Sequence, residues 1–314
     1  MDRFKQIELT KDLGHYVWST VGEATENRNL TAEQVLQHIV SPDDAVASGI
    51  QNPKTISRPS LPVSLPNLRA PTYPNLFPMD PGYIVPLRVA RDRGVDLSTV
   101  DFMLGGSALN VLAEQNTSST TYVFRKVGRT IVLGKRNAYE KDFGKTGFRF
   151  ERLLTGEATD DVTAPAHSFE SLRLLRIGPF RVLVSADIDA QTEDGIVEIK
   201  SGNPRYFGTK LMFQMMSSGA SELHYAIKNR NRITGVARKS FAEMVPSDRE
   251  IEQFERKIIS SLERLLELSE LSELSEQTMG IRIDGSRQTT YRVTGFDADL
   301  LPLTEVIREL LFRD

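Results

Sequence analysis

The chain contains no cysteine and little histidine. Its 314 residues include four histidines, at positions 15, 38, 167 and 224, and no H-E-x-x-H spacing. Disulfides, zinc–thiolate sites, iron–sulfur clusters and cysteine nucleophiles are therefore excluded. A histidine-based metal centre or a Ser-His-Asp triad is disfavoured for the same reason.

Long hydrophobic runs are also missing. No segment approaches the length of a transmembrane span, and the first residues, MDRFKQIELT, lack the apolar stretch of a secretory signal. We therefore expect an intracellular protein without a membrane partner, in the nucleus or the cytoplasm. The absence of cysteine fits that expectation.

Charge is distributed unevenly along the sequence. The net charge is −3, but residues 125–240 have a net charge of +7 and residues 241–314 a net charge of −7. A basic middle segment favours a polyanionic partner such as nucleic acid. The alternative is that the net charge of any long segment departs from the average by a few charges, without functional meaning.

Composition divides the chain into three parts, which we expect to form one compact domain overall. Residues 1–50 are predicted to be partly helical, with a short helix from Thr31 to about Val40. Residues 51–97 are proline-rich up to Pro86 and are expected to wrap over the domain surface rather than form long helices. Residues 98–314 are predicted to form the main domain, including an acidic C-terminal helix.

Alternating and periodic apolar patterns predict the elements of that domain. A strand over 100–104 is followed by Gly105-Gly106-Ser107, which lacks a P-loop lysine and indicates a tight strand–helix turn. Further strands are expected at 121–127, 129–133, 172–177, 182–189, 196–200 and 290–293, and a strand–turn–strand over 222–237. Helices are expected at 206–217, 248–276 and 304–312.

The run RVLVSADIDAQTEDGIVEIKSG is the most informative stretch. Asp187 and Asp189 are two residues apart, as are Glu198 and Lys200, so each pair shares a strand face. A hairpin closed near Asp194-Gly195 would bring both pairs together. Clustered carboxylates need a cation, and hard oxygen ligands select Mg²⁺ or Mn²⁺. The alternative is a solvated strand face.

Two further polar residues are expected near that cluster. Lys210 and Gln214 lie four residues apart on the predicted helix 206–217, so they share one helical face. That face could look back at the carboxylates, or both side chains could simply point to solvent.

Four motifs occur in order: Gly147-Phe-Arg-Phe-Glu151, Asp187-Ile-Asp189, Glu198-Ile-Lys200 and Lys210-Leu-Met-Phe-Gln214. Over about residues 70–240 the chain resembles the DXO family of decapping 5′→3′ exoribonucleases, a branch of the PD-(D/E)xK nuclease fold. The resemblance implies an α/β (α+β) fold with a mixed central β-sheet flanked by helices.

The resemblance also implies roles for the motif residues. Glu151, Asp187, Asp189 and Glu198 would bind Mg²⁺ or Mn²⁺, and Lys200 would position the attacking water. Lys210 and Gln214 would line the site and contact the scissile phosphate. The expected function is a metal-dependent nuclease that hydrolyses phosphodiester bonds at RNA 5′ ends, by decapping, 5′→3′ exonucleolysis or both. Single-stranded DNA is an alternative substrate.

Basic side chains downstream of the motifs are candidates for contacts to the nucleic-acid backbone. For several of them simple solubility is the competing explanation. The candidates are Arg205, Lys228, Arg230 and Arg232.

Two positions depart from the family pattern. Gly105 stands where the family has an arginine that helps to hold the substrate's 5′ end, and Asp187 replaces a more common glutamate. The alternative function is therefore a catalytically weak nuclease-fold protein that binds nucleic acid or acts as a scaffold partner of another exonuclease. The acidic C-terminal helix would then be a docking surface.

Overall fold

The computed structural model describes most of the middle of the chain. The described residues are 3–19, 39–40, 54–69, 81–108, 112, 120–135, 143–161, 163, 167–203, 207–230, 232–244, 246–273, 279–284 and 287–292.

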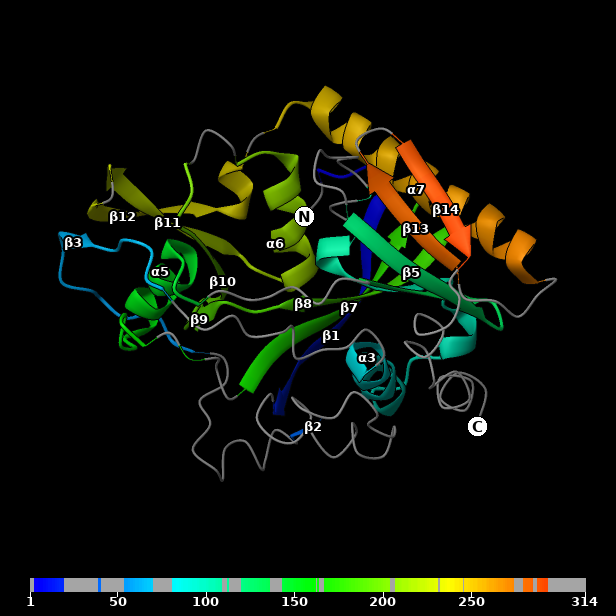
Figure 1. Ribbon diagram of the computed structural model, residues 1–314, viewed down its shortest axis with the longest axis horizontal. Helices are drawn as coiled ribbons and strands as arrows, with labels where there is room; N and C mark the ends of the chain where they lie inside the picture. The colour runs from blue at the N-terminus through cyan, green and yellow to red at the C-terminus, as the bar shows by residue number, and fades with distance from the viewer. Residues whose placement is uncertain are drawn as a thin grey trace.

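Two mixed β-sheets form the framework (Figure 1). The larger has nine strands in the order β14-β13-β5-β6-β4-β8-β7-β1-β2, and the smaller has five in the order β3-β12-β11-β10-β9. In the larger sheet β4 pairs in parallel with β6 and β8, and in the smaller β10 pairs in parallel with β11. The other pairs are antiparallel.

The strands of the nine-stranded sheet are β1 Ile7–Ser19, β2 Ile39–Val40, β4 Phe102–Gly105, β5 Thr120–Val127, β6 Thr130–Lys135, β7 His167–Ile177, β8 Phe180–Asp187, β13 Met279–Asp284 and β14 Arg287–Arg292. Those of the five-stranded sheet are β3 Val63–Ser64, β9 Ala190–Thr192, β10 Gly195–Lys200, β11 Glu222–Asn229 and β12 Arg232–Ser240.

Helices flank the sheets. They are α3 Pro81–Asp92, α5 Thr146–Thr155, α6 Thr209–Ser218 and α7 Asp248–Glu273, with 3₁₀ turns η2 at Leu97–Thr99 and η4 at Phe241–Glu243. Figure 1 shows α3 and α7 on opposite sides of the nine-stranded sheet. The predicted mixed α+β architecture with flanking helices is therefore confirmed, with two sheets rather than one.

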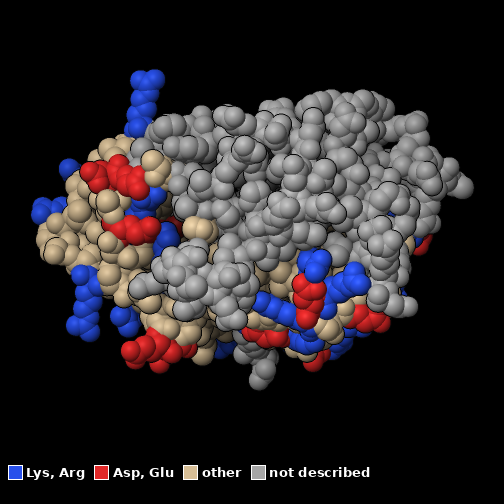
Figure 2. Space-filling view, turned by 90° about the horizontal axis from the view of Figure 1, so that it is seen from below, with Lys and Arg blue, Asp and Glu red and all other residues tan. Residues whose placement is uncertain are grey.

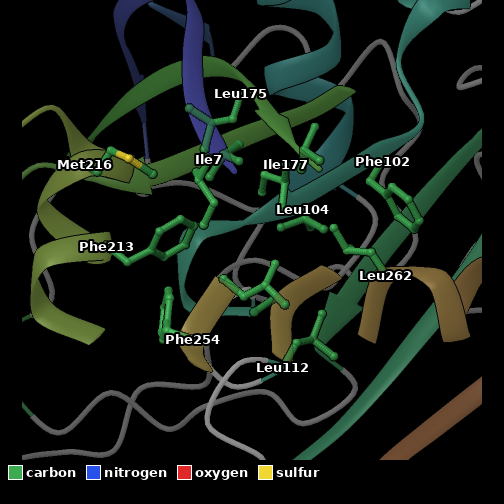
Figure 3. Close-up of a cluster of buried hydrophobic side chains, with 14 of the residues drawn as sticks. Ile7, Phe102, Leu104, Leu112, Leu175, Ile177, Phe213, Met216, Phe254 and Leu262 are labelled. Atoms are coloured by element: carbon green, nitrogen blue, oxygen red, sulfur yellow. The ribbon is translucent and has the colours of Figure 1, made fainter. Parts of the chain in front are cut away.

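The largest apolar core lies between the nine-stranded sheet, α6 and α7 (Figure 3). Alternate residues of β4, Phe102 and Leu104, enter it beside Phe213 of α6 and Leu262 of α7, and all four side chains are buried. Each such side chain contributes about 1.5–3 kcal/mol by leaving water. This core fixes α6 against the sheet.

The N-terminal segment differs from its prediction. Residues Ile7–Ser19 form the long strand β1, paired antiparallel with β7, where the sequence indicated only partial helix. Long-range pairing with an existing strand outweighs weak local preference here. The helix expected from Thr31 lies outside the described residues except for its end, where Ile39–Val40 form β2 instead.

The proline-rich segment also differs in part. Residues Pro81–Asp92 form α3, with Pro86 inside the helix, although the prolines argued against a long helix here. Pro81 occupies the first helical position, where its missing N–H costs nothing. Residues 54–69 do lie along the domain surface, as expected of a wrapping segment.

Within the main domain most expected elements are confirmed. The β5–β6 and β11–β12 hairpins, β7, α6 and α7 occur where the patterns indicated. A helical turn starts at Gly106 directly after β4, so the tight strand–helix turn is confirmed as well. The helix predicted at 304–312 lies outside the described residues.

Candidate active site

The chain passes from one sheet to the other through Asp187, Ile188 and Asp189. β8 of the nine-stranded sheet ends at Asp187, and β9 of the five-stranded sheet begins at Ala190. Between them the Ile188 N–H donates to the Phe169 carbonyl at 2.8 Å. The predicted hairpin is thus formed by β9 and β10. The expectation that Asp187 and Asp189 share one strand face is wrong, because the strand ends between them.

Asp189 is fixed against β10. Its Oδ2 accepts a hydrogen bond from the backbone N–H of Ile199 at 2.8 Å. The Lys200 ammonium nitrogen lies 3.7 Å from the same oxygen. A carboxylate at the crossover is therefore held beside the strand that contains the E-x-K motif.

Strand β10 presents different residues to its two faces. Val197 and Ile199 pack with Phe150 and Leu154 of α5 in a second apolar cluster. Glu198 points the other way and is only 2% exposed. The alternation of a strand thus places a buried carboxylate on the face opposite α5.

Lys200 forms an ion pair with Glu198. Burial alone would lower the pKa of the Lys200 ammonium, but the negative charges of Glu198 and Asp189 outweigh it and raise that pKa. Lys200 therefore remains a cation at neutral pH.

Gln214 also contacts Glu198. From α6, its Nε2 donates to Glu198 Oε1 at 2.8 Å. This face of the helix therefore looks toward the carboxylates, which was one of the two alternatives that the sequence left open; the other was that it points to solvent. Lys210, one turn earlier on α6, is exposed. The structure thus brings Gln214 into the cluster and leaves Lys210 at its margin.

Glu151 approaches from α5 and is half-buried. Burial raises the pKa of its carboxyl well above the usual range, and the negative charge of Asp189 adds to that rise, partly offset by Lys200. Weaker contributions come from Glu198 and Asp187. The Glu151 carboxyl is therefore coupled electrostatically to residues of two other motifs.

Glu198 has a shifted pKa as well. Burial raises the pKa of this carboxyl to about 7, against the opposing effect of the Lys200 ammonium, and the charge of Asp189 raises it further. Several carboxylates in one poorly solvated place disfavour one another's ionised forms. Added positive charge would stabilise this arrangement.

The donor set fits a hard divalent cation, since Glu151, Asp187, Asp189 and Glu198 all offer carboxylate oxygens. Within the part of the chain that the structure describes, no three carboxylate or imidazole groups are close enough to hold a metal ion as they stand. In this arrangement the Lys200 ammonium is the positive partner of Glu198.

Sequence reasoning missed a polar pair beside Asp187. Asp187, exposed at the end of β8, is the cross-strand partner of Glu170 on β7. Glu170 accepts a 2.5 Å hydrogen bond from the hydroxyl of Tyr16 on β1. Burial, followed by the charge of Glu170, raises the pKa of Tyr16. The sequence did not point to Tyr16, because residues 7–19 were not predicted to form a strand.

The candidate nucleic-acid contacts lie apart from the carboxylates. Lys228, Arg230 and Arg232 are exposed at the tip of the β11–β12 hairpin, while Arg205 is outside the described residues. Lys200 pairs with Tyr225, three residues before Lys228, so the tip lies roughly 10 Å further along the strand. Figure 2 shows Lys and Arg side chains projecting at this end of the molecule with Asp and Glu among them.

Gly105 lies at the corresponding end of the neighbouring strand. It is the last residue of β4 and pairs with Ser185 of β8, two residues before Asp187. Because β4 and β8 are parallel, their carboxyl ends meet at one edge of the sheet. Position 105 therefore faces the same region as the crossover.

Comparison with known proteins gives a match in structure alone. No protein-family model matches the chain, and no curated protein matches it by sequence. A mutant S. pombe Rai1 in complex with 3′-FADP matches with a TM-score of 0.62 and 12% identity, over 92% of this chain and 94% of that one.

Two further solved structures have the same fold. Candida albicans Rai1 in complex with pU5-Mn²⁺ has a TM-score of 0.59 and 12% identity, over 98% of this chain and 96% of that one. K. lactis Dxo1 in complex with manganese has a TM-score of 0.55 and 14% identity, with coverages of 94% and 93%. The resemblance to the DXO nucleases is thus confirmed at the level of the fold.

Proposed function

We propose that this protein is a metal-dependent nuclease that hydrolyses phosphodiester bonds at RNA 5′ ends, by decapping, 5′→3′ exonucleolysis or both. The observation that supports it most is the proximity of Asp189, Glu198 and Lys200 at the sheet crossover and on β10, with the Glu151 carboxyl of α5 electrostatically coupled to them. The Rai1 and Dxo1 fold likeness points to the same class of reaction.

The carboxylates would hold one or two Mg²⁺ or Mn²⁺ ions, through Glu151, Asp187, Asp189 and Glu198. A bound divalent ion supplies an activated water and neutralises charge on the phosphate. Manganese in the Candida albicans Rai1 and K. lactis Dxo1 structures is consistent with this choice of ion.

Lys200 has the role of an electrostatic stabiliser. Its ammonium is held by Glu198 and lies 3.7 Å from Asp189, so it is oriented without help from substrate. A fixed cation beside a reacting phosphate stabilises the charge that develops in the transition state. It would also orient the attacking water.

Gln214 and Lys210 act from α6. The Gln214 amide holds Glu198 in place and lines the site, while Lys210 on the exposed first turn of the helix would contact the scissile phosphate. At the hairpin tip, Lys228, Arg230 and Arg232 would contact more distant phosphates, as would Arg205. An RNA substrate would place the protein in the nucleus or the cytoplasm.

The test uses end-labelled RNAs that differ only at the 5′ end, with monophosphate, triphosphate or cap, and a single-stranded DNA of the same sequence. We expect Mn²⁺- or Mg²⁺-dependent loss of label with wild-type protein and suppression by a chelator. Glu198→Gln should reduce turnover by at least about 10²-fold, because it removes one carboxylate charge from the site.

Glu193→Gln is the matched control. Glu193 lies in the exposed turn of the same β9–β10 hairpin, and its substitution should leave turnover unchanged. Equal loss of activity in both variants, or turnover that survives chelation, would contradict the proposed metal site. Faster cleavage of DNA than of any RNA would redirect the proposal to a DNA-directed nuclease.

A second candidate function is a catalytically weak nuclease-fold protein that binds nucleic acid or supports a separate exonuclease. Gly105 in place of the expected arginine favours it, and so does the spacing of the carboxylates, because no three of them among the described residues are close enough to hold a metal ion as they stand. RNA binding that Glu198→Gln leaves undiminished, with no turnover of any substrate by wild type, would select this alternative.

A further inference from the structure

We infer that residues 54–69, which we call the strap, fix the position of helix α5, and that Asn67 and Ser57 of the strap are positioning residues for Glu151. The inference rests on the proposed function in one respect, the role of Glu151 at the metal site. The strap contacts both ends of α5 and both outer parts of the five-stranded sheet.

Asn67 caps the N-terminus of α5. Its Oδ1 accepts a hydrogen bond from the backbone N–H of Thr146 at 2.9 Å and another from the Thr146 hydroxyl at 3.0 Å. The residue at the helix's own N-cap position, Lys145, makes no side-chain capping bond. A side chain from the strap thus replaces the local cap that helix starts normally have.

Backbone groups of the strap add to this N-terminal anchor. The Leu65 carbonyl, 2.9 Å from the Thr146 hydroxyl oxygen, is a second acceptor for the one proton of that hydroxyl, and the Leu68 N–H donates to the Gly144 carbonyl at 2.9 Å. Arg149 of α5 donates to the Pro66 carbonyl. The first turn of α5 is therefore tied to the strap over residues 65–68.

Ser57 binds the C-terminal end of the same helix. Its backbone N–H donates to the Leu154 carbonyl at 2.6 Å, and its hydroxyl donates to the same carbonyl at 3.0 Å. The last carbonyls of a helix have no partner within the helix. Ser57 supplies one from outside.

The strap is itself anchored at two places on the five-stranded sheet. Near its start, Thr55 bridges to Gln191 of β9, and the Gln191 N–H donates to the Lys54 carbonyl at 2.7 Å. Further on, Val63–Ser64 form β3 and pair with β12. The strap therefore starts beside β9, at one edge of this sheet, crosses α5, and forms the outer strand β3 at the opposite edge.

Apolar contacts fill the space beneath. Leu65 of the strap is buried with Phe150 and Leu154 of α5 and with Val197 and Ile199 of β10. The partly buried strap residues Ile56, Leu61 and Val63 pack against the same cluster. Helix α5 is thus enclosed between the sheet and the strap.

The enclosure stabilises a short helix, since α5 has only ten residues. A helix of that length is marginal by itself and depends on tertiary contacts. Glu151 lies in its middle, whereas Asp189 and Glu198 belong to the sheet. The strap's anchors at both ends of α5 therefore set where Glu151 lies relative to the other carboxylates.

The experiment compares full-length Asn67→Ala, Asn67→Asp, Ser57→Ala and Ser60→Ala. Asp at position 67 keeps the accepting oxygen, and Ser60 is an exposed strap residue with no hydrogen bond to α5 in the described part of the chain. Three quantities are measured: hydrogen exchange of the peptide spanning 146–155, affinity for Mn²⁺ alone, and kcat and KM on labelled RNA.

We expect Asn67→Ala to raise amide exchange in the first turn of α5 roughly five-fold, the usual effect of losing an N-cap. Mn²⁺ affinity and kcat should fall by a similar factor, with KM for RNA unchanged. Asn67→Asp should restore all three. Ser57→Ala should have a weaker effect in the last turn, because its N–H still binds Leu154, and Ser60→Ala should match wild type.

Exchange and Mn²⁺ affinity of Asn67→Ala equal to those of Ser60→Ala would overturn the inference. So would changed exchange with unchanged Mn²⁺ affinity, since the strap would then stabilise α5 without positioning Glu151. If wild-type protein turns over no RNA, the proposed function fails, and exchange and Mn²⁺ affinity still decide the role of the strap.

Discussion

At the scale of single residues, two adjacent glycines at the end of β4 have different surroundings. A Cβ at Gly105 would meet nothing closer than the Ser185 carbonyl oxygen at 3.9 Å. A Cβ at Gly106 would lie 3.2 Å from the Cβ of Ser217 on α6 and 3.4 Å from that of Ala186 on β8. Only the second glycine is required by close packing.

Gly106→Ala is therefore expected to destabilise the protein by about 1–2 kcal/mol, because α6 or β8 must move to admit the methyl group. Gly105→Ala, the matched control, should change stability by no more than about 0.5 kcal/mol. Urea unfolding of both variants measures the difference. Equal losses at the two positions would contradict the packing argument.

The separation of Glu198 and Lys200 by two residues was enough to predict that these two side chains meet, whereas the helical spacing of Lys210 and Gln214 left open whether their face meets the carboxylates or solvent. Local periodicity gives the face on which a side chain lies and not its partner across the fold. Tyr16 and Asn67 could not be found in this way. Tyr16 reaches the site region through the β1–β7 register, and Asn67 caps a helix 79 residues away in sequence. No short pattern encodes either contact.

At the scale of elements, α7 begins with a reciprocal cap. Glu250 Oε2 accepts from both the backbone N–H and the hydroxyl of Ser247, at 2.8 Å and 2.7 Å, and the Glu250 N–H donates to the Ser247 hydroxyl oxygen at 3.3 Å. This is the capping-box arrangement, which satisfies N–H groups that a helix start leaves unpaired.

We expect Ser247→Ala to cost about 1 kcal/mol of unfolding free energy, the usual value for a lost N-cap. Ser260→Ala is the control, because Ser260 is exposed in the middle of α7 and alanine favours a helix there. Thermal unfolding should show a lower midpoint for Ser247→Ala only. An equally lower midpoint for both variants would contradict a specific capping role for Ser247.

The ion pair between Lys54 of the strap and Glu157 makes a pH-dependent contribution to the free energy of unfolding. Burial would raise the pKa of Glu157, but hydrogen bonds from Lys54 and Thr155 lower it below the usual value of 4.5. A lowered carboxyl pKa stabilises the fold above that usual value, and the contribution is lost as pH falls through the lowered pKa.

The stability difference between wild type and Glu157→Gln should therefore be constant above about pH 5 and shrink below it. Its size should be at most about 1 kcal/mol, because both side chains are about one-third exposed and solvent screens the pair. Urea unfolding of both proteins from pH 3 to pH 7 tests this. A difference that grows toward low pH would have the wrong sign.

Elements with strong apolar patterns, such as β7, β8 and β10, were predictable from sequence. Their assignment to two different sheets was not, because alternation reveals which residues share a face and says nothing about which strand is the neighbour. Helix α3 was missed because its prolines argued for extended chain, although its buried residues include Val85, Leu87 and Val89.

At the scale of the whole molecule, α6 links the two sheets. Its Phe213 is fully buried in the large core and contacts Phe254 of α7, with ring centroids 5.3 Å apart, and Phe4, with centroids 6.1 Å apart. On its other side α6 reaches β10 through Gln214. We therefore expect the sheets to unfold together.

Phe213→Ala should cost about 3–5 kcal/mol, while Phe213→Leu should cost less than about 1.5 kcal/mol because most of the apolar volume is kept. The single tryptophan, Trp18, lies in β1 and reports on the nine-stranded sheet by fluorescence, and circular dichroism reports on both sheets. Coincident urea transitions are expected in every variant. Two separate transitions would contradict a cooperative link through α6.

The strap has a consequence for self-association. An open β-sheet exposes unpaired backbone groups along its outer strands, and these invite pairing with another copy of the chain. Here one outer strand of the smaller sheet, β9, has three residues and is bridged by Thr55, and the other, β3, has two residues with Pro62 beside it. Neither outer strand of this sheet is long enough to pair stably with a strand of another copy. The segment that encloses α5 thus also discourages edge-to-edge pairing of the smaller sheet.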